Sequence, residues 1–104
     1  MVLIMTKSEI KQDLINLRFY CINKSLVTNV DFIKKYENLL SLYTNVLKKC
    51  FDSKIVLFFN HYYISGQNIS LVTCAYDLGI CRSNVTKLNK NLVNYLFESL
   101  NNVR

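Results

Sequence analysis

The stretch "LVTCAYDLGICRSNVTKLNK", from Leu71 to Lys90, decides the fold because it sets Gly79, one of only two glycines, between two helical patterns. Apolar residues recur at helical spacing before Gly79, and a second helical pattern begins after it. A left-handed backbone at a helix C-terminus is cheap only for glycine. Gly79 therefore predicts the end of one helix and a sharp turn into the next.

The side chains around this turn fit two closely crossing helices. Ser70 can cap the first helix, whose inner face is expected to consist of Leu71, Cys74, Ala75 and Leu78. The inner stripe of the longer final helix is expected to consist of Val85, Leu88, Leu92 and Leu96. Helix-turn-helix packing requires a small residue in the first helix, a glycine at the turn and apolar residues after it. This sequence has Ala75, Gly79, Ile80, Val85 and Leu88 at the corresponding spacing.

The polar residues of the final helix are candidates for DNA contact. In a helix-turn-helix the second helix enters the major groove with its N-terminal residues toward the bases. The residues expected to face outward are Arg82, Ser83, Thr86, Lys87 and Lys90, and Asn84 is a sixth candidate for DNA contact. Arg82 can bridge guanine O6 and N7, Ser83 and Thr86 can reach bases or phosphates, and the lysines suit phosphates. Asn84 either caps or flanks the helix, and the alternative for every charge here is a solvated helix face.

Three further helices are expected before this pair. "TKSE" at Thr6 matches a capping box, which predicts a helix over 7–23. Thr28, followed by Asp31, predicts a second helix that runs to about residue 49. Asp52 can cap a third helix that contains "IVLFF". We expect an all-α single domain over 1–104 with about five helices, in which 1–50 is a leading helical part and 51–104 the helix-turn-helix part.

Composition limits the kind of protein. A chain of 104 residues that is 51% hydrophobic and 19% charged can bury a core without disulfides or metal. No run approaches the roughly 20 apolar residues that cross a bilayer, so no membrane partner is expected. The start "MVLIM" is too short for a signal peptide, and translation starts at Met1 or at Met5.

The cysteines and acidic residues do not indicate a catalytic or metal site. The four cysteines form no CxxC pair, so we expect reduced thiols in a cytoplasmic protein and no metal. His61 lies in an aromatic segment, where a structural role is expected, and the seven acidic residues are scattered. There is no glycine-rich phosphate loop. We therefore expect no enzyme, no catalytic residue and no cofactor.

A formal net charge of +6 favours a polyanionic partner. The charge is not concentrated near the candidate site. Residues 1–50 carry eight basic and four acidic residues, and residues 51–104 carry five and three. Charge alone therefore does not single out the second half, although no acidic residue lies between Gly79 and Phe97.

From about Asp52 to Leu100 the chain resembles a sigma-70 region-4-type helix-turn-helix. The resemblance rests on "SL" at Ser70, Ala75, "LGI" at Leu78 and "RSNV" at Arg82, after an apolar helix and a loop. Small phage regulators of late transcription, of the ArpU and RinA kind, have a similar plan. Cys81 differs from such motifs, which usually have a serine cap there, and the lost hydroxyl costs about 1 kcal/mol.

The resemblance implies a sequence-specific DNA-binding transcription regulator of phage origin. Double-stranded DNA is then the main partner, and the leading helices supply a homodimer contact or a surface for RNA polymerase or another host protein. The alternative is a small protein-binding adaptor or inhibitor of host machinery that keeps the helix-turn-helix frame without reading bases. Anti-CRISPR proteins and signal-recognition-associated helix-turn-helix proteins are examples of that class.

Overall fold

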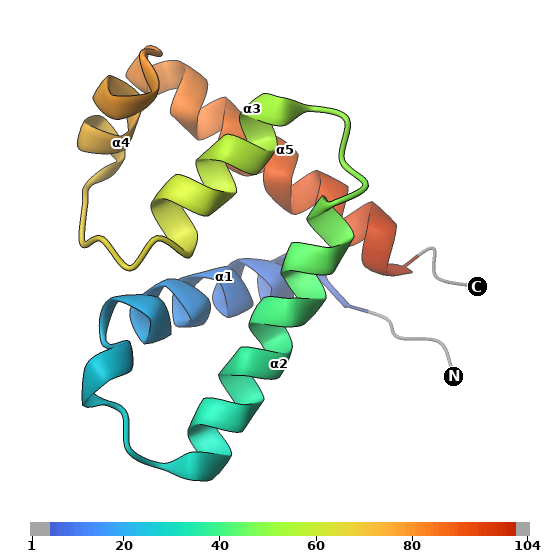
Figure 1. The fold of residues 1–104 in the computed structure, drawn as a ribbon. Helices are drawn as coiled ribbons and strands as arrows, with labels where there is room; N and C mark the ends of the chain where they lie inside the picture. Colours follow the sequence, from blue (N-terminus) through green and yellow to red (C-terminus); the bar gives the residue numbers. More distant parts are fainter. Residues whose placement is uncertain (1–4, 102–104) are drawn as a thin grey trace.

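The computed structural model describes residues 5–101, and this range contains five α-helices and no strand (Figure 1). The α-helices are α1 Lys7–Ile22, α2 Val30–Leu47, α3 Ser53–Phe58, α4 Leu71–Leu78 and α5 Arg82–Asn101. A 3₁₀ turn, η1 (Lys24–Leu26), follows α1, and a π-helical turn, η2 (Phe59–Tyr63), continues α3. The all-α prediction is confirmed. Met1, one of the two expected translation starts, lies outside the described residues.

The first two helix starts follow capping chemistry. The Thr6 hydroxyl accepts the Glu9 amide at 3.1 Å, and the Glu9 carboxylate accepts the Thr6 amide at 3.0 Å, which completes the predicted capping box. For α2 the predicted cap was wrong by one residue. The cap is Asn29, whose side chain accepts the Phe32 amide at 3.0 Å, and not Thr28. Asparagine is the stronger cap of the two.

The helix α5 is the centre of the molecule and contacts each of the other four α-helices. One hydrophobic cluster draws on all five α-helices. Its completely buried members include Leu14 from α1, Tyr43 from α2, Phe58 from α3, Cys74 from α4 and Leu92 from α5. Burying this shared apolar surface stabilises the leading helices and the α3–α5 part together.

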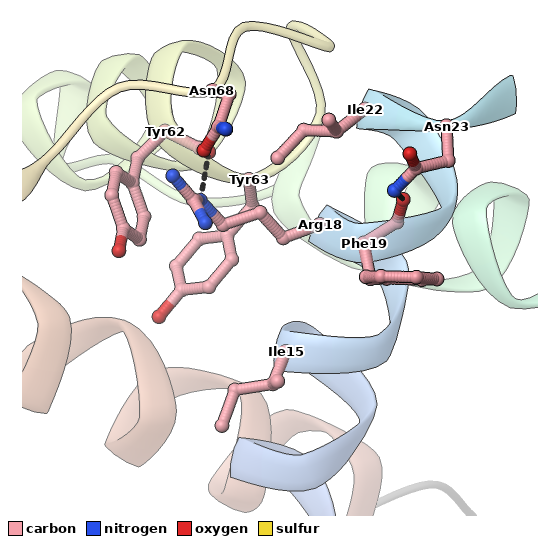
Figure 2. A pocket seen from close by; sticks show the side chains of 8 residues that line it. All are labelled: Ile15, Arg18, Phe19, Ile22, Asn23, Tyr62, Tyr63 and Asn68. Atoms are coloured by element: carbon pink, nitrogen blue, oxygen red, sulfur yellow. Dashed lines mark hydrogen bonds between the residues drawn. The ribbon is translucent and has the colours of Figure 1, made fainter.

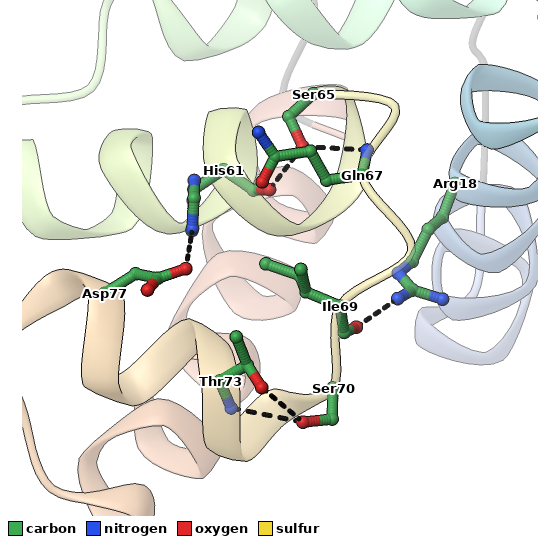
Figure 3. A network of polar contacts seen from close by, with 8 residues as sticks. All are labelled: Arg18, His61, Ser65, Gln67, Ile69, Ser70, Thr73 and Asp77. Atoms are coloured by element: carbon green, nitrogen blue, oxygen red, sulfur yellow. Dashed lines mark hydrogen bonds and ion pairs between the residues drawn. The ribbon is translucent and has the colours of Figure 1, made fainter.

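The loop between η2 and α4 is held against α1 by Arg18 (Figure 3). The Arg18 side chain donates a hydrogen bond to the Tyr62 carbonyl at 3.2 Å and another to the Ile69 carbonyl. Its guanidinium also lies 4.3 Å from the centre of the Tyr62 ring. On the other side of the loop, His61 and Asp77 approach to 2.9 Å and join η2 to α4. The Arg18 link therefore positions the chain just before α4, and the His61–Asp77 link holds the last turn of α4 against η2.

Within residues 5–101, no helix is long and apolar enough to cross a membrane. All four cysteines are free thiols. The same range contains no group of three His, Cys, Asp or Glu residues that could hold a metal ion.

Candidate nucleic-acid interface

The turn between α4 and α5 is closed by backbone hydrogen bonds around Gly79. Gly79 has a φ of 68°, in the left-handed region. Its amide donates to the Tyr76 carbonyl at 3.1 Å, and the Ile80 amide donates to the Ala75 carbonyl at 3.0 Å. These two bonds form a Schellman motif, which satisfies carbonyls at the end of α4. The predicted left-handed helix end at Gly79 is confirmed.

The inner faces of α4 and α5 largely match the prediction. The Ser70 hydroxyl caps α4 by accepting the Thr73 amide at 3.1 Å. All four residues of the predicted inner stripe of α5 are buried, namely Val85, Leu88, Leu92 and Leu96. On α4, Cys74 and Ala75 are buried but Leu71 is 36% exposed, so its predicted inner position was wrong. Leu71 is the first residue of α4, one turn before the buried Cys74 and Ala75, so the core does not extend to the start of this helix.

The six predicted site residues lie together on the first three turns of α5. All of them are exposed, namely Arg82, Ser83, Asn84, Thr86, Lys87 and Lys90. Among the residues described, none of these side chains makes a hydrogen bond or an ion pair. We call these six residues the α5 strip. The strip offers cationic and neutral hydrogen-bonding groups and no carboxylate.

One edge of the α5 strip borders α3. A groove of about 280 Å³ is lined there by Asp52, Lys54, Ile80, Asn84, Lys87, Leu88 and Asn91. Asn84 and Lys87 therefore lie at the α3 edge of the strip. Lys54 was missed by sequence reasoning, because its place beside α5 depends on how α3 packs. The Asp52 carboxylate in the same groove accepts the Lys54 amide at 3.0 Å, so this edge carries both signs of charge.

The opposite edge of the strip borders the start of α1. A groove of about 340 Å³ is lined there by Lys7, Lys11, Thr86, Asn89, Lys90, Val93 and Asn94. Reciprocal hydrogen bonds of 2.8 and 2.9 Å between the Met5 backbone and the Asn101 side chain hold the start of α1 against α5. Sequence reasoning missed Lys7 and Lys11, because it assigned the leading helices to a dimer or partner surface.

The rotation of α5 is held by a hydrogen bond from the core. The Tyr63 hydroxyl donates to Asn89 Oδ1. Burial raises the pKa of the Tyr63 phenol, so the hydroxyl remains protonated and keeps its role as donor. The amide group of Asn89 is thereby left with its NH₂ end for other partners.

The first turn of α5 begins after Cys81, whose side chain is exposed. The Cys81 carbonyl accepts the amides of Asn84 and Val85 at 2.9 and 3.2 Å, which starts the helix. The residue carries no hydroxyl to satisfy a further amide of the first turn.

Comparisons with models of protein families, with curated proteins and with solved structures found no match for this chain. The chemistry of the α5 strip and its two edges suits a partner that offers negative charge together with hydrogen-bond acceptors. Arginine supplies a rigid fork of donors, lysine a point charge, and serine, threonine and asparagine supply neutral donors and acceptors.

Proposed function

We propose that this protein is a sequence-specific DNA-binding transcription regulator whose helix-turn-helix is formed by α4 and α5. The observation that carries the proposal is the exposed, carboxylate-free α5 strip on a helix that follows a tight glycine turn. A major groove about 12 Å wide admits one α-helix, and the N-terminal residues of that helix meet the base edges. The resemblance to sigma-70 region 4 and to small phage regulators supports the same function.

The residues of the α5 strip have different roles in this proposal. Arg82 begins the helix and reads a guanine through paired donors, while Ser83 and Thr86 reach bases or phosphates. Lys87 and Lys90 neutralise phosphates, and Asn84 contacts DNA from the edge beside α3. Contacts to phosphate set affinity and its salt dependence, whereas contacts to bases set sequence preference.

A homodimer is part of the proposal, because one helix reads only a short half-site and two linked copies add affinity. Exposed apolar side chains on the leading helices support a second copy as the partner there. They are Ile15, Phe19, Leu26 and Val30, with exposed fractions of 58%, 65%, 77% and 75%. RNA polymerase or another host protein is a further proposed partner.

The same leading helices favour a second candidate function, that of a protein-binding adaptor or inhibitor of host machinery. A pocket of about 580 Å³ lies between α1 and η2, outside the α5 strip. Figure 2 shows the side chains that line it. The pocket is lined by Ile15, Arg18, Phe19, Ile22, Asn23, Tyr62, Tyr63 and Asn68. Aromatic, aliphatic and arginine side chains of this kind are enriched where proteins bind one another.

The two functions are separated by selecting duplexes from a random pool at about 150 mM salt, where weak nonspecific binding is suppressed. The regulator proposal predicts that wild type enriches a defined sequence and that Arg82→Ala with Lys87→Ala abolishes the enrichment. The control is the double variant Lys34→Ala/Lys35→Ala, which removes the same amount of positive charge from α2. This control is expected to enrich the same sequence as wild type. If wild type enriches no sequence, the regulator proposal fails. A protein partner that remains bound after nuclease treatment then supports the adaptor.

A further inference from the structure

The two edges of the α5 strip differ in charge. On the α3 side, Lys54 and Lys87 share their groove with Asp52. On the α1 side the lining contains Lys7, Lys11 and Lys90 and no acidic residue. The α1 groove is therefore the more positive of the two, although its lysines come from opposite ends of the chain.

The carboxylates of α1 do not neutralise this groove directly. The Glu9 carboxylate accepts the Thr6 amide at 3.0 Å, and its own amide donates to the Thr6 hydroxyl, which holds Glu9 at the start of the helix. The Asp13 carboxylate accepts the Tyr43 hydroxyl at 2.7 Å and therefore turns toward α2. Each of the two acidic residues of α1 is thus engaged with a partner outside the groove lining.

The groove also holds neutral groups of the kind that bind phosphate. Asn89 is fixed by the Tyr63 hydroxyl through its carbonyl oxygen, which leaves its NH₂ available. Thr86 and Asn94 line the same groove, and Thr86 also belongs to the α5 strip. Phosphate oxygens in DNA complexes accept hydrogen bonds from lysine, threonine and asparagine side chains alike. The lining therefore combines fixed charge with neutral donors.

Resting on the proposed function, we infer that the α1 groove holds the DNA phosphate backbone at one border of the major groove that α5 occupies. Lys7 and Lys11 contact phosphates there together with Lys90. A helix lying in the major groove has one phosphate backbone on each side, and the α1 groove lies directly beside the α5 strip. The DNA-binding surface therefore extends to the first helix of the chain, and its lysines add affinity without reading sequence.

The test compares two double variants. One is Lys7→Ala/Lys11→Ala, and the control is Lys34→Ala/Lys35→Ala, which removes two exposed positive charges from the N-terminal part of α2, outside the lining of the α1 groove. Binding is measured on the selected duplex and on an unrelated duplex of equal length, from about 50 to about 300 mM salt. The α1 variant is expected to lose about tenfold or more in affinity for both duplexes at low salt. Its slope of log affinity against log salt falls by about 2, while its sequence preference stays. The α2 variant keeps the wild-type slope.

A second variant separates charge from packing, because the Lys7 ammonium also lies 5.4 Å from the Phe97 ring centre. Lys7→Arg with Lys11→Arg keeps the charge and is expected to restore the slope. The inference is overturned if the alanine variant behaves like the α2 control, or if it loses sequence preference with an unchanged slope. Suppose that one of these two results is found while the Arg82→Ala/Lys87→Ala double variant still loses sequence preference. The proposed function then stands and only the inference fails. If wild type prefers no duplex, both fail.

Discussion

The pair α1–α2 and the pair α4–α5 are both helices joined by a connection, but the two connections differ. Residues 23–29 join the first pair through η1, and α2 then begins with the Asn29 cap and Asp31 in its first turn. Residues 79–81 join the second pair through one left-handed glycine, and α5 begins with no acidic residue in its first turn. The first pair thus has a long connection and an acidic residue at the start of its second helix, whereas the second pair has a short connection and no such residue.

The side chains of the two pairs differ in the same way. In the first pair, aromatic rings join the two helices, with Tyr20 and Tyr36 stacked at 5.4 Å between ring centres. The exposed Lys24 of η1 and the half-buried Glu37 of α2 form an ion pair at 3.4 Å. In the second pair, small buried side chains such as Ala75 let the helices approach, and the charged residues at the start of α5, from Arg82 to Lys90, are all positive. Both pairs therefore contribute to the core, but only the second pair presents a positively charged surface at the start of its second helix.

The largest expected effect tests whether the two pairs share one core. Leu14→Ala in α1 and Leu92→Ala in α5 each remove a completely buried side chain and are expected to cost about 2–5 kcal/mol. Urea unfolding followed by far-UV circular dichroism and by tyrosine fluorescence measures the cost. Both variants are expected to unfold in a single transition. Two separate transitions in either variant would show that the two helix pairs fold independently, which would contradict a shared core.

The next effect concerns the crossing of α4 and α5. Ala75 is 4% exposed, so Ala75→Leu overpacks the contact and is expected to destabilise the protein by about 1–3 kcal/mol. Tyr76→Leu, at a neighbouring position that is 85% exposed, is the matched control and is expected to change stability by about 0.5 kcal/mol or less. Thermal unfolding of both variants measures the difference. Equal stability of the two variants would contradict a close crossing at Ala75.

A smaller effect is expected at the glycine of the turn. A Cβ on Gly79 would meet no atom within 4 Å, so the cost of Gly79→Ala comes only from the left-handed backbone and is about 1–2 kcal/mol. Asparagine tolerates this conformation better, so Gly79→Asn is expected to cost less than Gly79→Ala. The free energies of unfolding of the two variants provide the measurement. A larger cost for asparagine would mean that space, and not backbone conformation, limits this position.

The smallest effect is a gain at the start of α5. Cys81→Ser restores a hydroxyl at the cap position and is expected to stabilise the protein by about 0.5–1 kcal/mol. Cys81→Ala removes the thiol without adding a hydroxyl and is the control. Chemical denaturation of the three proteins measures the gain. No difference between the serine and alanine variants would indicate that the first turn of α5 is already satisfied.

Local chemistry made much of the α4–α5 pair predictable. The Ser70 cap, the left-handed Gly79 and the buried stripe of α5 each depend on residues close in sequence. Leu71 was misplaced because helical spacing says which residues share a face, but not where the core ends. The third helix was expected to contain all of "IVLFF", whereas the α-helix ends at Phe58 and a π-helical turn that no residue pattern marks begins at Phe59.

The edges of the candidate site were not predictable from the sequence. Lys7 and Lys11 lie more than 70 positions from Lys90 in the chain, and they reach its side only because α1 packs along α5. Lys54 reaches Lys87 through the packing of α3 in the same way. Charges that come together through tertiary packing leave no periodic signal in the sequence. The α5 strip does leave a helical pattern in the sequence, because all six of its residues belong to one helix.

Mapping the amide chemical-shift changes of the protein on titration with its selected duplex tests the central claim most directly. We predict that the largest changes fall on Arg82–Lys90, with further changes around Lys7 and Lys11. Amides in the middle of α2 are predicted to remain unchanged. The largest changes on α2, or on the surface around Ile15 and Phe19, would contradict the assignment of α5 as the DNA-reading helix.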